Sequence, residues 1–301
     1  MRAGKIEDYW PEFKHYLKCV LTTYLLPLIT ETMPHITTYS GIDWHYDIEG
    51  TGEHLLFIHG WGVDKRIWRQ QSKFFSQYYR IMTIDLPGHG KSGWKKINLD
   101  VMVKDLNAIL QALQFDNVSV VGSSLGGLVA LKLYELYPAA VKRLIFVGSM
   151  PKFSKSADYP HGLDVNKMRK LGGQLDSDYP SIVNVFFRSL FTKEERQSRR
   201  FKWLQKFRQN EGVPIKQALV EYLDILEQED LREVLKKVHV PIQFINGRDD
   251  EICNKETVAF LKTVRPESRF DFFEACGHFP FLSKPYEFNL VVEEFLKGST
   301  L

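Results

Sequence analysis

The stretch VVGSSLGGL, residues 120–128, decides the fold, and it places two adjacent serines between glycines. Glycines stand two residues before and two residues after Ser124, at Gly122 and Gly126. This is the G-x-S-x-G pattern, in which a serine lies on a sharp turn between a strand and a helix. Around Ser123 the same two positions hold valine and leucine, whose side chains would obstruct so tight a turn. The pattern therefore selects Ser124 as the candidate nucleophile.

The segments on either side of this turn have the context that the pattern requires. NVSVVG before it is short and β-branched, as a buried strand is, and LGGLVALKLYELYP after it predicts a helix that ends at a proline. Similar apolar runs bounded by glycine or proline alternate with helical patterns at residues 54–60, 80–88, 117–123, 143–149 and 241–247. The predicted fold class is α/β, with a mostly parallel central sheet flanked by helices. Residues 41–50 alternate more evenly and predict an antiparallel edge strand.

The alternation stops between residues 151 and 238, which are helical in pattern and rich in lysine, arginine and phenylalanine. We therefore predict a helical cap over residues 151–238, inserted into a core of residues 41–150 and 239–301. Within the cap, RQSRRFKWLQKFRQN (residues 196–210) carries no acidic residue. Such a run is either a solvated helix face or a docking surface for an acidic partner.

Composition excludes several classes of protein. The net charge of +3 over 301 residues does not indicate nucleic acid as the main partner. The three cysteines are scattered, with no C-x-x-C spacing, so neither a disulfide framework nor a zinc site is predicted. We expect a reducing, cytoplasmic setting, and we expect no metal or organic cofactor.

Residues 1–40 precede the predicted core and are treated as an extension. Their most apolar stretch, residues 16–29, is too short to span a bilayer and is interrupted by Pro27. Acidic residues before it and the lack of a small-residue cleavage site argue against a secretory signal. Three interpretations stay open: an amphipathic helix packed on the protein, a membrane contact through residues 9–30, or a natural start at Met33.

A serine nucleophile needs a base, and the base needs an orienting acid. In this architecture the acid and then the histidine follow the serine along the chain. The segment INGRDDEIC supplies three acidic candidates after a late strand, of which we favour Asp250, with Asp249 second. His278 follows the last predicted strand, in the apolar loop ACGHFPF, where a core-filling role would leave its ring nitrogens without partners. The predicted triad is Ser124, Asp250 and His278.

Acyl transfer also requires hydrogen-bond donors for the developing oxyanion. The backbone N–H of Leu125, directly after the nucleophile, is one candidate, and the N–H of Trp61 in the turn HGWG is the other. We expect the Trp61 indole to line the acyl pocket. His59 and His89 also lie in glycine turns but precede the serine, so we predict that they stabilise those turns.

The motifs HGWG, DLPGHGKS, GSSLGG, GRDDEI and GHFPFLSKP together resemble the α/β-hydrolase superfamily, over roughly residues 41–301. Within it, the chain is most similar to the carboxylesterases of biotin synthesis that demethylate pimeloyl-acyl-carrier-protein methyl ester. The stretches LLFIHGWGVDKRIW, SLGGLVA, GSMPKFSKSADYP and ACGHFPFLSKPYEF carry that similarity. The resemblance implies a serine carboxylesterase that acts on a small acyl ester presented on an acyl carrier protein.

The resemblance also implies roles in the cap. The segment IVNVFFRSL matches the piece that lines the acyl channel in the family, so Phe186 and Phe187 are expected to contact the pimeloyl chain. Two departures from the family stand out. Ser123 occupies a position where the family often has tryptophan, and residues 178–185 lack the arginines that help to bind the carrier protein. The basic residues that would replace part of that role are Arg196, Arg199, Arg200 and Lys202.

Three other functions remain open. A general short-chain carboxylesterase would use the same triad without a carrier protein. A carbon–carbon bond hydrolase, or a lyase of menaquinone synthesis, would need a cation in the pocket, for which Arg188 is the candidate in the acyl-lining segment. A non-catalytic receptor would use the cavity to bind a ligand. Haloalkane dehalogenase is disfavoured because that chemistry uses aspartate where this elbow has serine.

Overall fold

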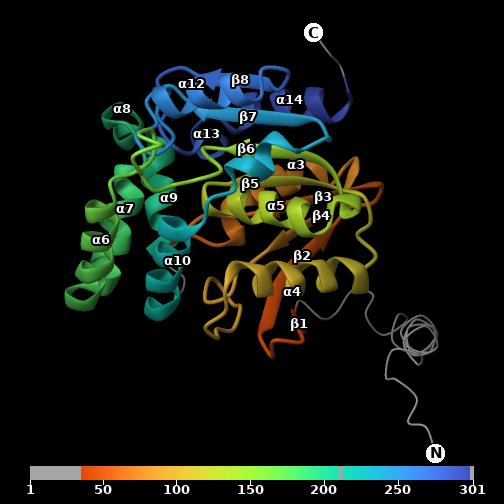
Figure 1. The fold of residues 1–301 in the computed structure, drawn as a ribbon, viewed down its shortest axis with the longest axis horizontal. Helices are drawn as coiled ribbons and strands as arrows, with labels where there is room; N and C mark the ends of the chain where they lie inside the picture. Colours follow the sequence, from red (N-terminus) through yellow and green to blue (C-terminus); the bar gives the residue numbers. More distant parts are fainter. Residues whose placement is uncertain (1–34, 210–212, 299–301) are drawn as a thin grey trace, which may run out of the picture.

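The computed structural model describes residues 35–209 and 213–298, and an eight-stranded sheet forms its centre (Figure 1). The order of the strands across the sheet is β1-β2-β4-β3-β5-β6-β7-β8. The pairs β1–β2 and β2–β4 are antiparallel, and every pair from β4 to β8 is parallel. The strands are β1 (His35–Thr37), β2 (Asp43–Glu49), β3 (Glu53–Ile58), β4 (Tyr79–Ile84), β5 (Val118–Ser123), β6 (Val141–Val147), β7 (Ile242–Gly247) and β8 (Arg269–Phe273). The predicted α/β class with a mostly parallel sheet is confirmed.

One strand lies elsewhere than the sequence predicts. β2 is antiparallel to its neighbour, as expected, but it does not form the edge of the sheet, because β1 pairs outside it. β1 is only three residues long, and it belongs to residues 1–40, which the sequence set apart as an extension. The other expectations for that segment, a membrane contact through residues 9–30 and a start at Met33, lie outside the described residues.

Helices cover both faces of the sheet because successive side chains of a strand point to opposite faces. In β3, Leu56 and Ile58 join one buried apolar cluster, while Leu55 and Phe57 join a second. The first cluster packs under α4 (Leu99–Ala112), α5 (Leu125–Leu136) and α12 (Lys255–Val264). The second packs under α3 (Arg69–Phe75) and α14 (Pro285–Leu296), which contact each other. Shorter turns of helix are η3 (Lys65–Trp68), η4 (Pro138–Ala140) and α13 (Pro280–Ser283).

The chain between β6 and β7 forms a separate group of helices, seen at the left of Figure 1. These are α6 (Val165–Ser177), α7 (Tyr179–Ser189), α8 (Lys193–Gln197), α9 (Arg199–Gln209) and α10 (Lys216–Gln228), while α11 (Arg232–Lys236), the last helix before β7, contacts α5 instead. All six fall within residues 151–238, and we call this segment the cap. Its exact division from the core stays a prediction. Within the described ranges, none of the helices is long and apolar enough to cross a membrane.

Candidate active site

Ser124 lies on the turn between β5 and α5 with a backbone conformation of φ 53° and ψ −118°. Few non-glycine residues adopt this region, and it turns the strand sharply into the helix. A β-carbon on Gly122 would lie 2.4 Å from the Gly126 carbonyl oxygen, and one on Gly126 would lie 2.3 Å from the Ile58 carbonyl oxygen. Both contacts are impossible, so only glycine fits at either position. The G-x-S-x-G spacing is therefore a packing requirement of this turn.

The two adjacent serines have different surroundings. Ser123 is fully buried, and its hydroxyl has no hydrogen-bond partner among the described residues. Ser124 is partly exposed and lines a cavity. Its backbone is held by a bond from its N–H to the Val147 carbonyl at 2.9 Å, and its carbonyl accepts from the Ser149 hydroxyl at 2.7 Å. The hydroxyl that reaches the cavity is the one that the glycine spacing selects.

Asp250 and His278 meet at the same edge of the sheet, because each follows the carboxyl end of a parallel strand. The His278 Nδ1 and the Asp250 Oδ2 are 2.8 Å apart, and both side chains are buried. The other Asp250 oxygen accepts the backbone N–H groups of Ile252 at 2.8 Å and Cys253 at 3.1 Å. A carboxylate only accepts, so Nδ1 carries the proton and Nε2 is left to accept one. Asp249, the second candidate, points to the surface.

The turn that carries Trp61 packs directly against Ser124. A β-carbon on Gly60 would come within 3.1 Å of the Ser124 Cβ, so a side chain at this position would crowd the serine. The Trp61 indole N–H donates to the Leu219 carbonyl in α10 at 2.9 Å, and its ring meets Phe186 edge-on at 4.9 Å between centroids. Trp61 therefore connects the core turn to the cap and lines the cavity, while contact of its indole with an acyl group stays a prediction.

Two buried histidines, His59 and His89, form hydrogen bonds that stabilise the turn carrying Trp61. His59 Nε2 accepts the Leu86 N–H at 2.9 Å, and His89 Nε2 accepts the Gly62 N–H at 3.2 Å. A ring nitrogen accepts only in neutral imidazole. Burial lowers the pKa of His59 to about 4, and burial together with the neighbouring His59 lowers the pKa of His89 well below its usual value. The expectation that both histidines stabilise glycine turns is met by these bonds.

The cavity joins Ser124 and His278 to apolar side chains of the cap. His278 is its only ionisable lining residue within the described part of the chain. The remaining lining residues are Gly60, Trp61, Phe153, Leu163, Met168, Leu171, Phe186, Leu190, Leu223, Leu226, Ile252 and Phe279. An apolar wall of this kind suits a hydrocarbon chain, with the polar groups confined to the place where chemistry occurs.

Of Phe186 and Phe187, predicted to contact the acyl chain, and Arg188, the candidate cation of the pocket, only Phe186 lines the cavity. Phe186 does so, but Phe187 is buried behind it, against Phe191 and Phe279. Arg188 is exposed, with its guanidinium 5.8 Å from the centre of the Phe201 ring. Consecutive residues of a helix point about 100° apart, so α7 cannot direct all three inward. The interpretation of Phe187 and Arg188 as cavity residues is therefore corrected.

Comparison with known proteins agrees with this geometry. A family model described as the alpha/beta hydrolase fold matches residues 53–285. The chain belongs to the α/β-hydrolase family. It is 34% identical to a "Pimeloyl-[acyl-carrier protein] methyl ester esterase" of Nitrosomonas europaea over 244 residues, covering 81% of this chain and 96% of that protein. A protein with the same name from Cronobacter sakazakii is also 34% identical, covering 79% and 92% of the two chains.

Among solved structures, this hydrolase is similar to the esterase EaEST of Exiguobacterium antarcticum. The TM-score is 0.79 at 25% sequence identity, and the match covers 88% of this chain and 100% of that one. A bromoperoxidase from Bacillus anthracis gives the same TM-score and identity over 87% and 99% of the two chains. Because this fold is shared by an esterase and a bromoperoxidase, the reaction has to be argued from the site.

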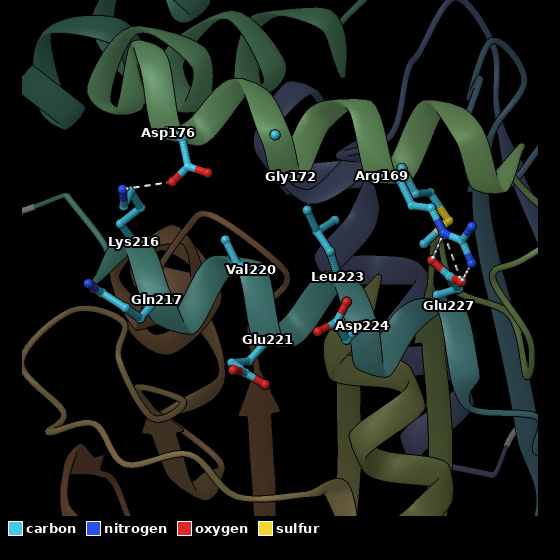
Figure 2. A pocket seen from close by; sticks show the side chains of 12 residues that line it. Arg169, Gly172, Asp176, Lys216, Gln217, Val220, Glu221, Leu223, Asp224 and Glu227 are labelled. Carbon is cyan, nitrogen blue, oxygen red and sulfur yellow. Dashed lines mark hydrogen bonds and ion pairs between the residues drawn. The ribbon is translucent and has the colours of Figure 1, made fainter.

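A groove of about 480 Å³ lies between α6 and α10 of the hydrolase (Figure 2). Figure 2 shows an ion pair near each end, Lys216 with Asp176 and Arg169 with Glu227. Met168 and Leu223 line both this groove and the active-site cavity. They form the wall between the two hollows, and the sequence did not single them out. Helical periodicity shows that α6 and α10 each have an apolar face, but not that these faces meet over a serine.

The basic run of the cap divides into two groups. Arg196 donates to the carbonyls of Arg188 and Phe191, and Arg200 donates to the carbonyl of Leu282, so both guanidinium groups bind the protein itself. In contrast, Arg199, Lys202 and Lys206 are exposed along α9. Their spacing of three and four residues places them on one side of the helix. We call these three residues the basic face.

Proposed function

We propose that this hydrolase is a serine carboxylesterase that removes the methyl group from pimeloyl-acyl-carrier-protein methyl ester. The observation that carries the proposal is the hydrogen-bonded His278–Asp250 pair in a cavity shared with Ser124 and otherwise walled by apolar side chains. The names of the Nitrosomonas and Cronobacter relatives support the choice of substrate.

In this mechanism His278 Nε2 takes the proton of the Ser124 hydroxyl while the serine oxygen attacks the ester carbonyl. The negative charge that develops on the carbonyl oxygen is stabilised by the backbone N–H groups of Trp61 and Leu125. Collapse of the tetrahedral intermediate breaks the bond to the methoxy group, which leaves as methanol with the proton from His278. Water then attacks the acyl-enzyme, with His278 again as base, and releases the free carboxylate and Ser124. Asp250 keeps the imidazole in the required tautomer throughout.

The basic face supports a carrier-bound substrate. Acyl carrier proteins are acidic, and an exposed row of cations increases the rate of encounter with an acidic partner in a salt-dependent way. In this proposal Arg199, Lys202 and Lys206 take the place of the arginines missing from residues 178–185. Arg196 and Arg200 are already bonded to carbonyl groups and contribute less. A cytoplasmic location stays a prediction.

A kinetic comparison on purified protein tests the proposal. We expect methyl pimeloyl-acyl-carrier protein to exceed p-nitrophenyl esters by orders of magnitude in kcat/KM, with Ser124→Ala as the inactive blank. Reversing the charges of the basic face should lower kcat/KM about 10-fold for the carrier-bound ester only. Preference for short free esters with no salt dependence would instead identify a general esterase, and full turnover by Ser124→Ala would contradict the mechanism.

The structure disfavours the carbon–carbon bond hydrolase or lyase. Their acidic substrates require a cation beside the reacting group, and Arg188, the candidate, lies at the surface. Within the described residues the cavity wall holds no lysine or arginine. The receptor alternative predicts ligand binding without turnover, and the same kinetic comparison separates it from an enzyme.

A further inference from the structure

The loop that carries His278 is bound to the cap as well as to the sheet. The His278 backbone N–H donates to the Leu190 carbonyl at 2.8 Å. The N–H of the preceding Gly277 donates to the Glu195 carboxylate at 3.0 Å. Two consecutive amides at the candidate base are therefore held by one short cap segment, residues 190–195. This segment lies outside every motif that identified the triad.

One oxygen atom of Glu195 contacts both the first turn of α8 and the loop that carries His278. Its Oε2 accepts the Thr192 N–H at 2.6 Å in addition to the Gly277 N–H. The Glu195 N–H in turn donates to the Thr192 hydroxyl at 3.0 Å. Thr192 and Glu195 thus form a capping box, which satisfies free N–H groups at the start of a helix, here α8. The same carboxylate oxygen fixes the first turn of α8 and the loop of the base.

The contact between the segment and the loop leaves little room for movement. A β-carbon on Gly277 would lie 2.5 Å from the Leu190 carbonyl oxygen and 3.1 Å from the Glu195 Oε2. On the other side of His278, the Phe279 ring packs 5.7 Å from the Phe191 ring, centre to centre. Displacements of about 1 Å at a reacting group lower rates by about 100-fold. The position of this segment therefore bears directly on the position of the imidazole.

We propose that Glu195 is a positioning residue for His278. Its carboxylate holds the Gly277 amide, so that the cap fixes the position of the loop that carries the imidazole, while Asp250 fixes its tautomer. The proposal rests on the proposed function only in taking His278 as the base. It assigns to the cap a part in the chemical step, in addition to forming the wall of the cavity.

Three variants test the proposal. Glu195→Ala removes the acceptor, and we expect kcat to fall about 10- to 100-fold with KM within about 2-fold of the original protein. Glu195→Gln keeps a carbonyl oxygen that accepts both N–H groups, so its kcat should stay within about 3-fold. Thr192→Ala weakens the same capping box but leaves the bond to Gly277, and it should lower Tm by about 3 °C with kcat within about 3-fold.

Each contrary result overturns the proposal. Unchanged kcat in Glu195→Ala shows that the bond does not position the base. An equal loss in Thr192→Ala shows that only the stability of α8 matters, and an equal loss in Glu195→Gln shows that the charge matters and not the acceptor. If Glu195→Ala fails to fold, Glu195→Asp, one methylene too short to reach Gly277, replaces it with the same expected loss.

A second readout separates this inference from the choice of substrate. A fluorophosphonate probe reacts with an activated serine regardless of the natural ester, so its rate of labelling reports on the activation of Ser124 and not on the choice of substrate. We expect Glu195→Ala to slow labelling about 10-fold and Glu195→Gln to leave it unchanged. Labelling of the original protein without turnover of the carrier-bound ester would contradict the proposed substrate and leave the role of Glu195 intact.

Discussion

The two sides of the active-site cavity are built differently. On the sheet side, Asp250 receives two backbone N–H groups and the glycines of the elbow touch neighbouring backbone. On the cap side, α6 and α10 are separated by a groove, and a β-carbon on Gly173 would meet nothing within 4 Å. The candidate catalytic groups thus lie in closely packed surroundings, while the apolar wall of the cavity has open space behind it.

The largest effect is expected from the buried acid. Asp250→Asn places an amide N–H opposite His278 Nδ1, which forces the wrong tautomer, so kcat should fall about 10³- to 10⁴-fold. Steady-state kinetics on any ester that the protein hydrolyses measures this loss. Asp249→Asn is the matched control, because Asp249 is exposed, and it should change kcat less than about 2-fold. A comparable loss in the control would show that the acid has been wrongly assigned.

A pair of glycine substitutions compares the two sides directly. Gly126→Ala drives a methyl group to within 2.3 Å of a backbone oxygen, and it should cost about 3 kcal/mol or more in the free energy of unfolding. Gly173→Ala lies in a helix with open space around it and should stabilise the protein by about 0.5–1 kcal/mol. Urea unfolding monitored by tryptophan fluorescence measures both. Equal and small effects would mean that the sheet side is no tighter than the cap.

Lowering the pH should decrease the free energy of unfolding because His59 is buried on the sheet side. The pKa of His59 is about 4 in the folded protein, against about 6.5 when unfolded, so below pH 6.5 the unfolded chain binds a proton that the folded chain does not. Stability therefore falls as the pH falls, by about 2 kcal/mol from this group between pH 7 and pH 5. The free energy of unfolding should therefore fall less between pH 7 and pH 5 in His59→Gln than in the original protein, by about 2 kcal/mol. Urea unfolding of both proteins at the two pH values measures the difference. An identical decline would contradict a neutral His59.

The smallest effect concerns the wall between the cavity and the groove. Leu223→Ala should join the two hollows and raise kcat/KM for p-nitrophenyl esters of 12 to 16 carbons, relative to those of four to six, about 10-fold. Val220→Ala is the control, since Val220 lines the groove but not the cavity. Its chain-length profile should match that of the original protein. The same shift in both variants would mean that the groove itself, and not the wall, sets acyl length.

Sequence reasoning was most successful where chemistry and backbone geometry coincide. The glycine spacing around Ser124 and the position of His278 after the last strand are local patterns, and the structure brings these residues to one cavity. The choice of Asp250 over Asp249 is supported by their opposite burial.

The cap was harder to predict because its contacts join helices that are distant in sequence. Phe186 faces the cavity while its neighbours Phe187 and Arg188 do not, and only the rotation of α7 against the core determines this. Met168 and Leu223 are ordinary apolar residues of amphipathic helices. Glu195 is visible in the sequence as half of a capping box, TKEE, but its bond to Gly277 spans 82 residues and has no local signature.

The backbone of Ser124 has a consequence for how this protein evolves. A non-glycine residue at φ 53° and ψ −118° carries a conformational cost on the order of 1–3 kcal/mol. Glycine would adopt the same turn without that cost but has no hydroxyl. A library of variants selected for thermal stability alone would therefore favour Ser124→Gly, and the protein that results would be more robust and inert. At this position, selection for thermal stability favours glycine, and selection for activity favours serine.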